Sequence, residues 1–206
     1  MRLGPLRVPA GVVELRPPRL SDGGTWSRVR LRDRRYLEEW EPVAPGTWED
    51  RNSPLAWLAQ WGTLRGLARR GVSIPLVIVL DGRPAGQITV GGIVRGALCS
   101  GWVGYWVGTH AAGGGVATAA VAMVVDHCFA SAGLHRVEAT VRPENVPSLR
   151  VLAKLGFREE GLFRRYLDVA GDWRDHRCLA LTTEDIPGGL VARLLAEGRA
   201  APAEKV

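Results

Sequence analysis

The sequence predicts a single α+β domain built on a mixed β-sheet. First, its 206 residues suffice for one sizeable core and are short for two. Second, three strand-like segments follow one another through short turns, as in a meander. Third, a helical segment separates the fourth expected strand from the fifth, which is the arrangement of a right-handed crossover between parallel neighbours.

The N-terminal half is predicted as one strand and two helices. Residues 12–16 alternate as a short strand, and loosely spaced apolar residues over 20–36 predict a helix. Two prolines and a glycine predict a loop over 41–50. A second helix begins at an Asn52 or Ser53 cap and ends near 70, where Gly71 stops it.

The rest of the chain continues the sheet. Three consecutive strands are predicted from the segments IPLVIVL, QITVGGI and ALCSGWVGYWV. The turn DGRPAG joins the first two. A helix over 115–132, a strand over 135–141, a helix over 144–156 and two strands around a turn at 170–172 follow. Residues 1–185 are expected to form one domain, and 186–206 a peripheral or partly disordered C-terminal tail.

Composition limits the functional classes. No uncharged apolar stretch of about 18 residues predicts a membrane span, and the N-terminus lacks the apolar region of a secretory signal. Three distant cysteines fit a reduced, cytoplasmic protein better than a disulfide scaffold or metal site, so no metal is expected. The net charge of +6 permits a nucleic-acid surface. No basic run with interleaved aromatics stands out, so no direct DNA binding is expected.

A run of three glycines marks the change from strand to helix. Gly113, Gly114 and Gly115 can adopt positive φ and turn their N–H groups toward one point. The first N–H groups of the following helix are also unpaired, and its dipole favours an anion. A phosphate cradle and a plain flexible turn are both compatible with the glycines. The residues match neither a Walker loop nor a Rossmann fingerprint.

The context favours the cradle. Over about 75–182, the chain resembles the acetyl-CoA-binding core of the GCN5-related N-acetyltransferases. The resemblance lies in two segments, GYWVGTHAAGGGVATAAVAMVVDHCF and HRVEATVRPENVPSLRVLAKLGFREEG. VELRPPRLSD and RRYLEEWEP also look like the RimJ/RimL branch, which acetylates the N-terminal amine of ribosomal proteins. The resemblance implies a mostly antiparallel sheet of about seven strands, helices on both faces, splayed fourth and fifth strands, and acetyl-CoA as co-substrate.

The resemblance also implies which residues bind CoA. The backbone amides expected around the pyrophosphate belong to Gly113, Gly114, Gly115, Val116, Ala117 and Thr118. The main chains of Tyr105, Trp106 and Val107 are expected to pair with the pantetheine amides, as an added strand would. Their side chains are interpreted as packing residues. Ala112 stands where the family usually has Arg or Gln, which removes a side chain but no backbone donor.

Two residues at the start of the helix expected over 144–156 complete this set. Asn145 either caps the helix or binds the pantetheine arm, and Ser148 lies on the same face of the first turn. By resemblance, Ser148 is the candidate acid for the leaving thiolate. Glu138 is a candidate base for the acceptor amine, with a solvent-facing or salt-bridged role as the alternative. Asp168 and Asp175 are weaker candidates.

The acceptor site is expected among the tryptophan-rich N-terminal helices. Trp40 matches a tryptophan that lines the acceptor groove of the branch, and Glu39 is the acidic neighbour proposed to bind a cationic N-terminus. It belongs to a cluster of acids: Glu38, Glu39, Glu41, Glu49 and Asp50.

The sequence therefore predicts direct acetyl transfer from acetyl-CoA to a protein N-terminal amine, in a RimJ-like enzyme acting on a ribosomal protein. A small-molecule amine is the alternative acceptor. A ribosome- or RNA-binding module with weak catalysis is the alternative from another class. The oligomeric state stays open between monomer and homodimer.

Overall fold

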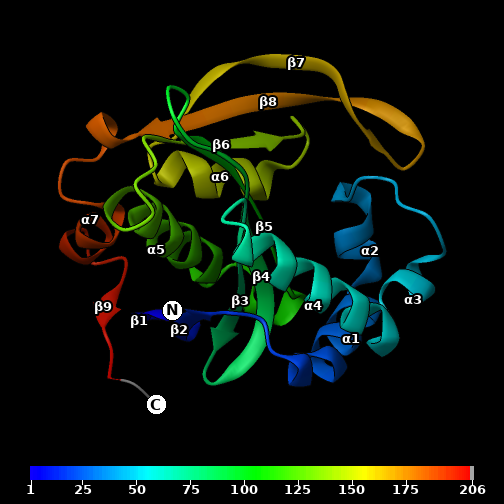
Figure 1. The fold of residues 1–206 in the computed structure, drawn as a ribbon. Coiled ribbons are helices and arrows are strands. Elements are labelled where there is room, and N and C mark those ends of the chain that lie inside the picture. The colour runs from blue at the N-terminus through cyan, green and yellow to red at the C-terminus, as the bar shows by residue number, and fades with distance from the viewer. Residues whose placement is uncertain (205–206) are drawn as a thin grey trace.

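The strands form one sheet, in the order β7-β8-β6-β5-β4-β3-β2-β1-β9 (Figure 1). A computed structural model describes residues 1–204 of the chain. The strands are β1 Leu3–Val8, β2 Gly11–Arg16, β3 Ile74–Leu80, β4 Arg83–Val94, β5 Ser100–Val107, β6 Arg136–Val141, β7 Arg158–Val169, β8 Asp172–Thr182 and β9 Ala201–Pro202. Among these, β5 and β6 pair in parallel and every other neighbouring pair with a given register is antiparallel, which confirms the predicted mixed sheet.

Helices cover both faces of the sheet (Figure 1). One group comprises α1 Gly23–Arg32, α2 Arg34–Leu37, α3 Trp48–Arg51 and α4 Pro54–Arg69. The other comprises α5 Val116–Ala130, α6 Val146–Lys154 and α7 Leu190–Ala196. Neighbouring residues of β4 show the two faces, because successive side chains of a strand point in opposite directions. Ile88 is buried in the core around α5, whereas Gln87 accepts a hydrogen bond from Trp26 of α1.

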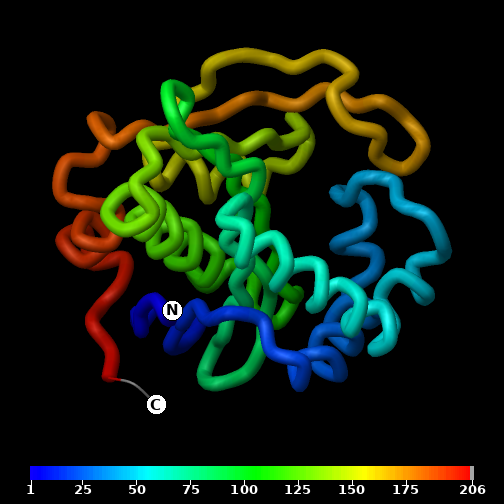
Figure 2. Tube along the Cα trace, in the orientation of Figure 1, coloured from blue at the N-terminus to red at the C-terminus, as the bar shows by residue number. Residues whose placement is uncertain are grey.

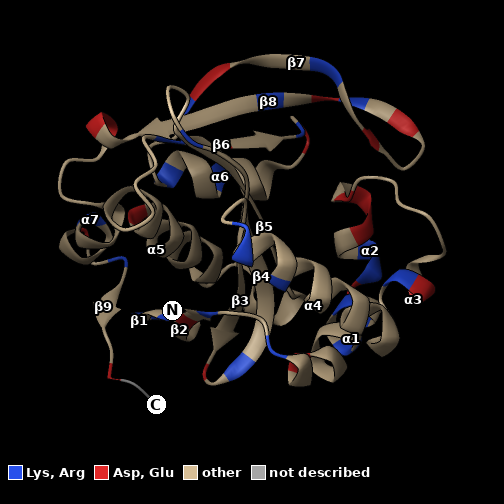
Figure 3. Ribbon diagram, viewed as in Figure 1, with Lys and Arg blue, Asp and Glu red and all other residues tan. Residues whose placement is uncertain are grey.

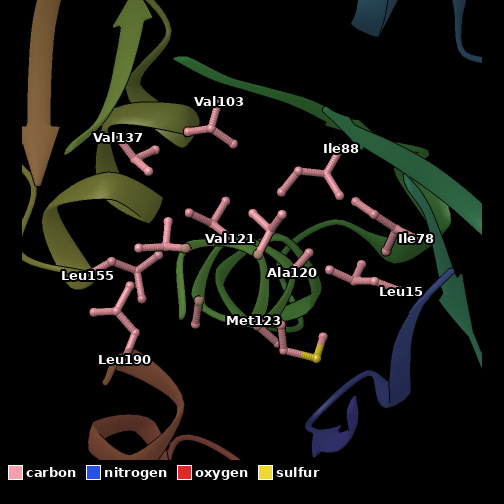
Figure 4. Close-up of a cluster of buried hydrophobic side chains, with 14 of the residues drawn as sticks. Leu15, Ile78, Ile88, Val103, Ala120, Val121, Met123, Val137, Leu155 and Leu190 are labelled. Carbon is pink, nitrogen blue, oxygen red and sulfur yellow. The ribbon is translucent and has the colours of Figure 1, made fainter. Parts of the chain in front are cut away.

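The core is centred on α5, which is apolar on nearly all sides and correspondingly buried. Figure 4 shows Ala120, Val121 and Met123 of this helix among side chains from the sheet, from Leu155 just after α6 and from α7. Alanines and valines let the helix lie close to the sheet, so that its backbone is shielded from water. Four of its side chains are fully buried: Val121, Val124, Val125 and Cys128.

The fourth and fifth expected strands, β5 and β6, are splayed. They pair only where Ser100–Trp102 faces Arg136–Glu138. Beyond that point β5 stays paired with β4 as far as Val107, whereas β6 follows β8. Within the described chain, the edge of 103–107 that faces β6 therefore has no ladder partner, which confirms the splay predicted from the resemblance.

Two strands and one short helix differ from the sequence-based expectation. β1 and β9 raise the number of strands from about seven to nine. β1 contains Gly4 and Pro5, which are unfavourable inside a strand and hide it in the sequence. The short α3 lies in the expected loop, where Thr47 and Asp50 form a capping box that stabilises its first turn.

The segment after Asp185, expected as a tail, carries α7 and β9. Leu190 and Leu194 of α7 are buried, and the Asp126 carboxylate accepts the backbone N–H groups of Leu190 and Val191 at 2.7 and 2.9 Å. β9 pairs with β1, so the first and the last strand of the described chain lie side by side (Figure 2). The last two positions, 205–206, of the expected tail lie outside the described residues.

Charged residues of both signs are distributed along the chain, as on β7 and β8 in Figure 3. Arg136 contacts Glu138 and Glu160, and Arg34 contacts Glu38 and Glu49. Much of the positive charge is thus balanced locally. Over residues 1–204, none of the helices is long and apolar enough to cross a membrane.

Candidate active site

A cavity of about 1220 Å³ borders residues 104–107, the part of β5 that no longer pairs with β6. One end is lined by the loop before α5, the first turn of α5 and the exposed side of α6. The other end is lined by aromatic and polar residues of the N-terminal helices, including Trp26, Arg30 and Trp40. β5 lies between them, with Tyr105, Trp106 and Val107 on the cavity wall. The cavity therefore connects the two halves of the predicted site.

The loop before α5 presents bare backbone to the cavity. Gly113 and Gly115 have φ angles of +79° and +86°, which L side chains rarely adopt. Gly115 caps α5 without a side-chain hydrogen bond, and the N–H of Ala119 is the first to bond back, to the Gly115 carbonyl. The N–H groups of 116–118, at the positive end of the helix dipole, remain for an anion. Five of the six predicted cradle residues line the cavity: Gly113, Gly115, Val116, Ala117 and Thr118.

Gly114, the sixth, lies on the other side of this loop. Its carbonyl accepts the N–H of Ala10, and a Cβ at Gly114 would lie 2.4 Å from the Ala10 Cβ. The β1–β2 turn thus leaves no room for a side chain. Glycine is required here by packing, whereas a Cβ at Gly113 meets no protein atom within 4 Å.

Ala112 lines the cavity without a polar side chain, and α6 supplies cations nearby. Arg150 and Lys154 are four residues apart, so they lie on one face of α6, and both line the cavity. Both are exposed. The sequence did not reveal these two residues, because only the fold brings α6 to the same cavity as the glycine loop.

Ser148 lies between a helix cap and a tyrosine. The Asn145 side chain accepts the N–H of Ser148 at 3.1 Å, so it caps α6 while lining the cavity. The Ser148 hydroxyl lies 3.0 Å from the Tyr105 hydroxyl. Burial raises the pKa of Tyr105 to about 12, against a partial lowering by the hydrogen bond to Ser148. The phenol is therefore protonated at neutral pH.

The sequence did not predict the contact of the Tyr105 hydroxyl with Ser148, and the Tyr105 side chain was interpreted as a packing residue. Only its main chain was expected to act, because Tyr105 and Ser148 are 43 residues apart and no motif links them. Trp106 points to the opposite face of β5, where its indole N–H donates to Gln87 at 3.2 Å. The alternation of the strand explains both placements.

Glu138 and Glu39, the acidic residues assigned a base and a binding role from the sequence, do not line the cavity. Glu138 lies outside it, and its carboxylate accepts a hydrogen bond from Arg136 at 2.6 Å, the salt-bridged alternative. Glu39 is exposed and also outside, although its neighbour Trp40 lines the cavity. Glu41 lines the cavity, and it is the single Asp or Glu among the described residues that do so.

Two further features bear on the chemistry. None of the described cysteines lines the cavity, and burial raises the pKa of the Cys128 thiol to about 12, which disfavours its thiolate. Across residues 1–204, no cluster of three or more His, Cys, Asp or Glu has the arrangement of a metal site. The candidate chemistry thus belongs to backbone donors, hydroxyls and one carboxylate.

Comparison with known proteins identifies the family. The family model described as an acetyltransferase (GNAT) domain matches residues 13–158. The chain belongs to the GNAT acetyltransferases. This GNAT chain also resembles a solved structure of Mycobacterium smegmatis RimJ in complex with CoA-disulfide. The two are 53% identical, with a TM-score of 0.97, over 98% of this chain and 97% of the other.

Two further relatives match different shares of this chain. The [ribosomal protein uS5]-alanine N-acetyltransferase of Escherichia coli is 31% identical over 155 residues, covering 74% of this GNAT chain and 78% of the relative. A probable N-acetyltransferase of Bacillus subtilis, YjcK, is 42% identical over 105 residues, which is 51% of this chain and 58% of that protein. The second match thus spans little more than half the length of the Bacillus protein.

Proposed function

We propose that this GNAT enzyme transfers the acetyl group of acetyl-CoA to the α-amine of a protein N-terminus, with a ribosomal protein as the acceptor. The observation that carries the proposal is the cavity that joins an anion cradle to an aromatic, open acceptor region across a splayed strand. The similarity to a RimJ over nearly the whole chain supports the acceptor class.

The proposed binding of acetyl-CoA uses the cavity wall from α5 to β5. The amides at Gly113 and Gly115–Thr118 face the pyrophosphate, which suits a helix N-terminus without a capping side chain. Arg150 and Lys154 face the remaining phosphate charge. The unpaired edge of β5 accepts the pantetheine arm in the manner of an added strand. The similar M. smegmatis RimJ was solved in complex with CoA-disulfide, which supports this assignment.

The proposed reaction is direct. The neutral amine attacks the thioester carbonyl carbon, the carbon–sulfur bond breaks, and the proton lost by the amine goes to water. Tyr105 stays protonated because its pKa is raised to about 12, so its hydroxyl can donate to the Ser148 oxygen. Ser148 then gives its proton to the departing sulfur and takes the Tyr105 proton in exchange. Water returns a proton to Tyr105, so that the thiol is formed and both hydroxyls are restored. A covalent cysteine route is unsupported, because no described cysteine lines the cavity.

A matched set of acceptors tests the proposal. Thiol release from acetyl-CoA is measured with N-terminal peptides of ribosomal proteins, the same peptides with a blocked α-amine, and free amino acids and polyamines. We expect turnover only with free N-termini, and mass spectrometry to place the acetyl group on the α-nitrogen. Equal turnover of blocked peptides, or preference for small amines, would contradict the proposed acceptor. Failure to bind acetyl-CoA in isothermal titration would favour a non-catalytic module.

A further inference from the structure

The segment 38–43 crosses from the N-terminal helices to the far side of the splay. The Arg142 guanidinium, just after β6, donates to the Glu39 carbonyl at 2.8 Å and lies 5.1 Å from the centroid of the Trp40 ring. The N–H of Val43 donates to the Asp168 carbonyl of β7 at 2.9 Å. The segment is thus fixed against β6 and β7, and Glu41 lies between its two attachments.

Glu41 lines the cavity, and one of its two carboxylate oxygens accepts no hydrogen bond from the described residues. Its Oε1 accepts a hydrogen bond from Nη2 of Arg30. In the described part of the chain, its Oε2 accepts no hydrogen bond. The side chain keeps 29% of its surface exposed, and Glu41 lines the cavity that is also lined by Tyr105 and Ser148. A carboxylate in this position, with one oxygen hydrogen-bonded and the other not, can accept an N–H from a cationic group.

Arg30 holds this carboxylate in place. Its side chain is only 7% exposed, and its Nε donates to the side chain of the buried Asn52. Its guanidinium carbon lies 4.9–5.4 Å from the centroids of three indole rings, those of Trp26, Trp48 and Trp106. Trp106 belongs to β5, so this cage ties the Glu41 carboxylate to the strand that carries Tyr105 on its other face.

Other acids near Trp40 do not compete for this role. Glu38 and Glu49 both pair with Arg34, and neither lines the cavity. Glu39 contributes only its backbone carbonyl, which accepts the hydrogen bond from Arg142. A cationic acceptor that enters the cavity meets one described carboxylate, that of Glu41.

We propose that Glu41 binds the α-ammonium group of the acceptor through its free oxygen, and that Arg30 is the positioning residue that orients it. This inference rests on the proposed function, since it names the residue that recognises the acceptor's charge. Glu41 serves as an anchor, and the proton is lost to water once the amine is bound.

The test compares Glu41→Gln with the wild-type enzyme, using Glu197→Gln as the control. Glu197 also contacts arginines, but it lies at the end of α7 and outside the cavity. A lost charge-assisted hydrogen bond predicts a KM for an N-terminal peptide raised by about 10- to 100-fold in Glu41→Gln. The Kd for acetyl-CoA and the control variant's KM should not change.

A binding measurement separates recognition of charge from a structural effect. In the complex with CoA, the wild-type enzyme should bind a free-amine peptide at least about 10-fold more tightly than its Nα-acetylated form. Glu41→Gln should bind both forms equally. The inference is overturned if the variant keeps the wild-type ratio, whatever its thermal stability.

The outcomes also separate this inference from the proposed function. A wild-type enzyme that acetylates small amines but no peptide would refute the proposed acceptor. The same KM comparison would then be made with that amine, because its ammonium group is shared. An unchanged KM in Glu41→Gln would refute the anchor alone.

Discussion

Replacing Gly113 by alanine tests the cradle most directly. The residue has a φ of +79°, and a Cβ built there meets no protein atom within 4 Å. The variant therefore creates no clash within the protein. Alanine in the left-handed region costs about 1–2 kcal/mol more than glycine. The new methyl group would also lie in the space where we propose that the pyrophosphate binds.

This cost has two measurable consequences. If the loop relaxes in the free protein, binding must restore its conformation, and 1–2 kcal/mol corresponds to a Kd for acetyl-CoA raised by about 5- to 30-fold. If the loop keeps its conformation, the cost lowers the Tm by about 2–8 °C for a chain of this size, and the methyl group still displaces the ligand. Isothermal titration and thermal unfolding of the same preparations measure both.

Gly133→Ala is the matched control. Gly133 follows the other end of α5, has a φ of +63°, and has open space around its Cβ position. It carries a similar conformational cost but does not line the cavity. We expect a similar loss of Tm and an unchanged Kd. Equal affinities of the two variants for acetyl-CoA would refute the assignment of Gly113 to the cradle.

Three further predictions concern catalysis, cofactor binding and stability. Ser148→Ala should lower kcat by about 10²- to 10⁴-fold, and Tyr105→Phe by less, because the serine keeps its hydroxyl when the tyrosine loses the 3.0 Å contact. Joint replacement of Arg150 and Lys154 by glutamine should raise the Kd for acetyl-CoA by about 2- to 30-fold and reduce its salt dependence, because both side chains are exposed cations. The hydrogen bond from its arginine neighbour lowers the pKa of Asp33 to about 2 from 3.8. The stability that this carboxylate contributes should therefore be complete above about pH 4 and lost as the pH falls toward 2, as urea unfolding at each pH would measure.

A specific result would contradict each of these three predictions. An unchanged kcat in Ser148→Ala would remove that hydroxyl from the mechanism. An unchanged Kd, with the wild-type salt dependence, would place the cations of α6 away from the cofactor. For Asp33→Asn, we expect a flatter stability profile between pH 4 and 2, and a profile identical to that of the wild type would contradict the assignment.

The sequence by itself determined most elements and the family. Apolar strands, the Ser53 cap and glycines after helices are local signals, and the structure has helices and strands close to where they predict them. The glycine loop and the PENVPSLR segment were recognisable because the backbone chemistry of each needs only neighbouring residues. Local signals did not reveal β1 and β9, because their pairing joins segments that meet only in the fold.

Only the tertiary structure decided which side chains share the cavity. It brought the Tyr105 hydroxyl to Ser148, turned Gly114 toward Ala10, and paired Glu138 with Arg136. It also separated neighbours that the sequence treats alike: Glu39 is exposed, and Glu41 lines the cavity beside Arg30. The physical reason is that side-chain direction within a short turn, and contacts across splayed strands, follow from long-range packing and are not encoded by residue spacing.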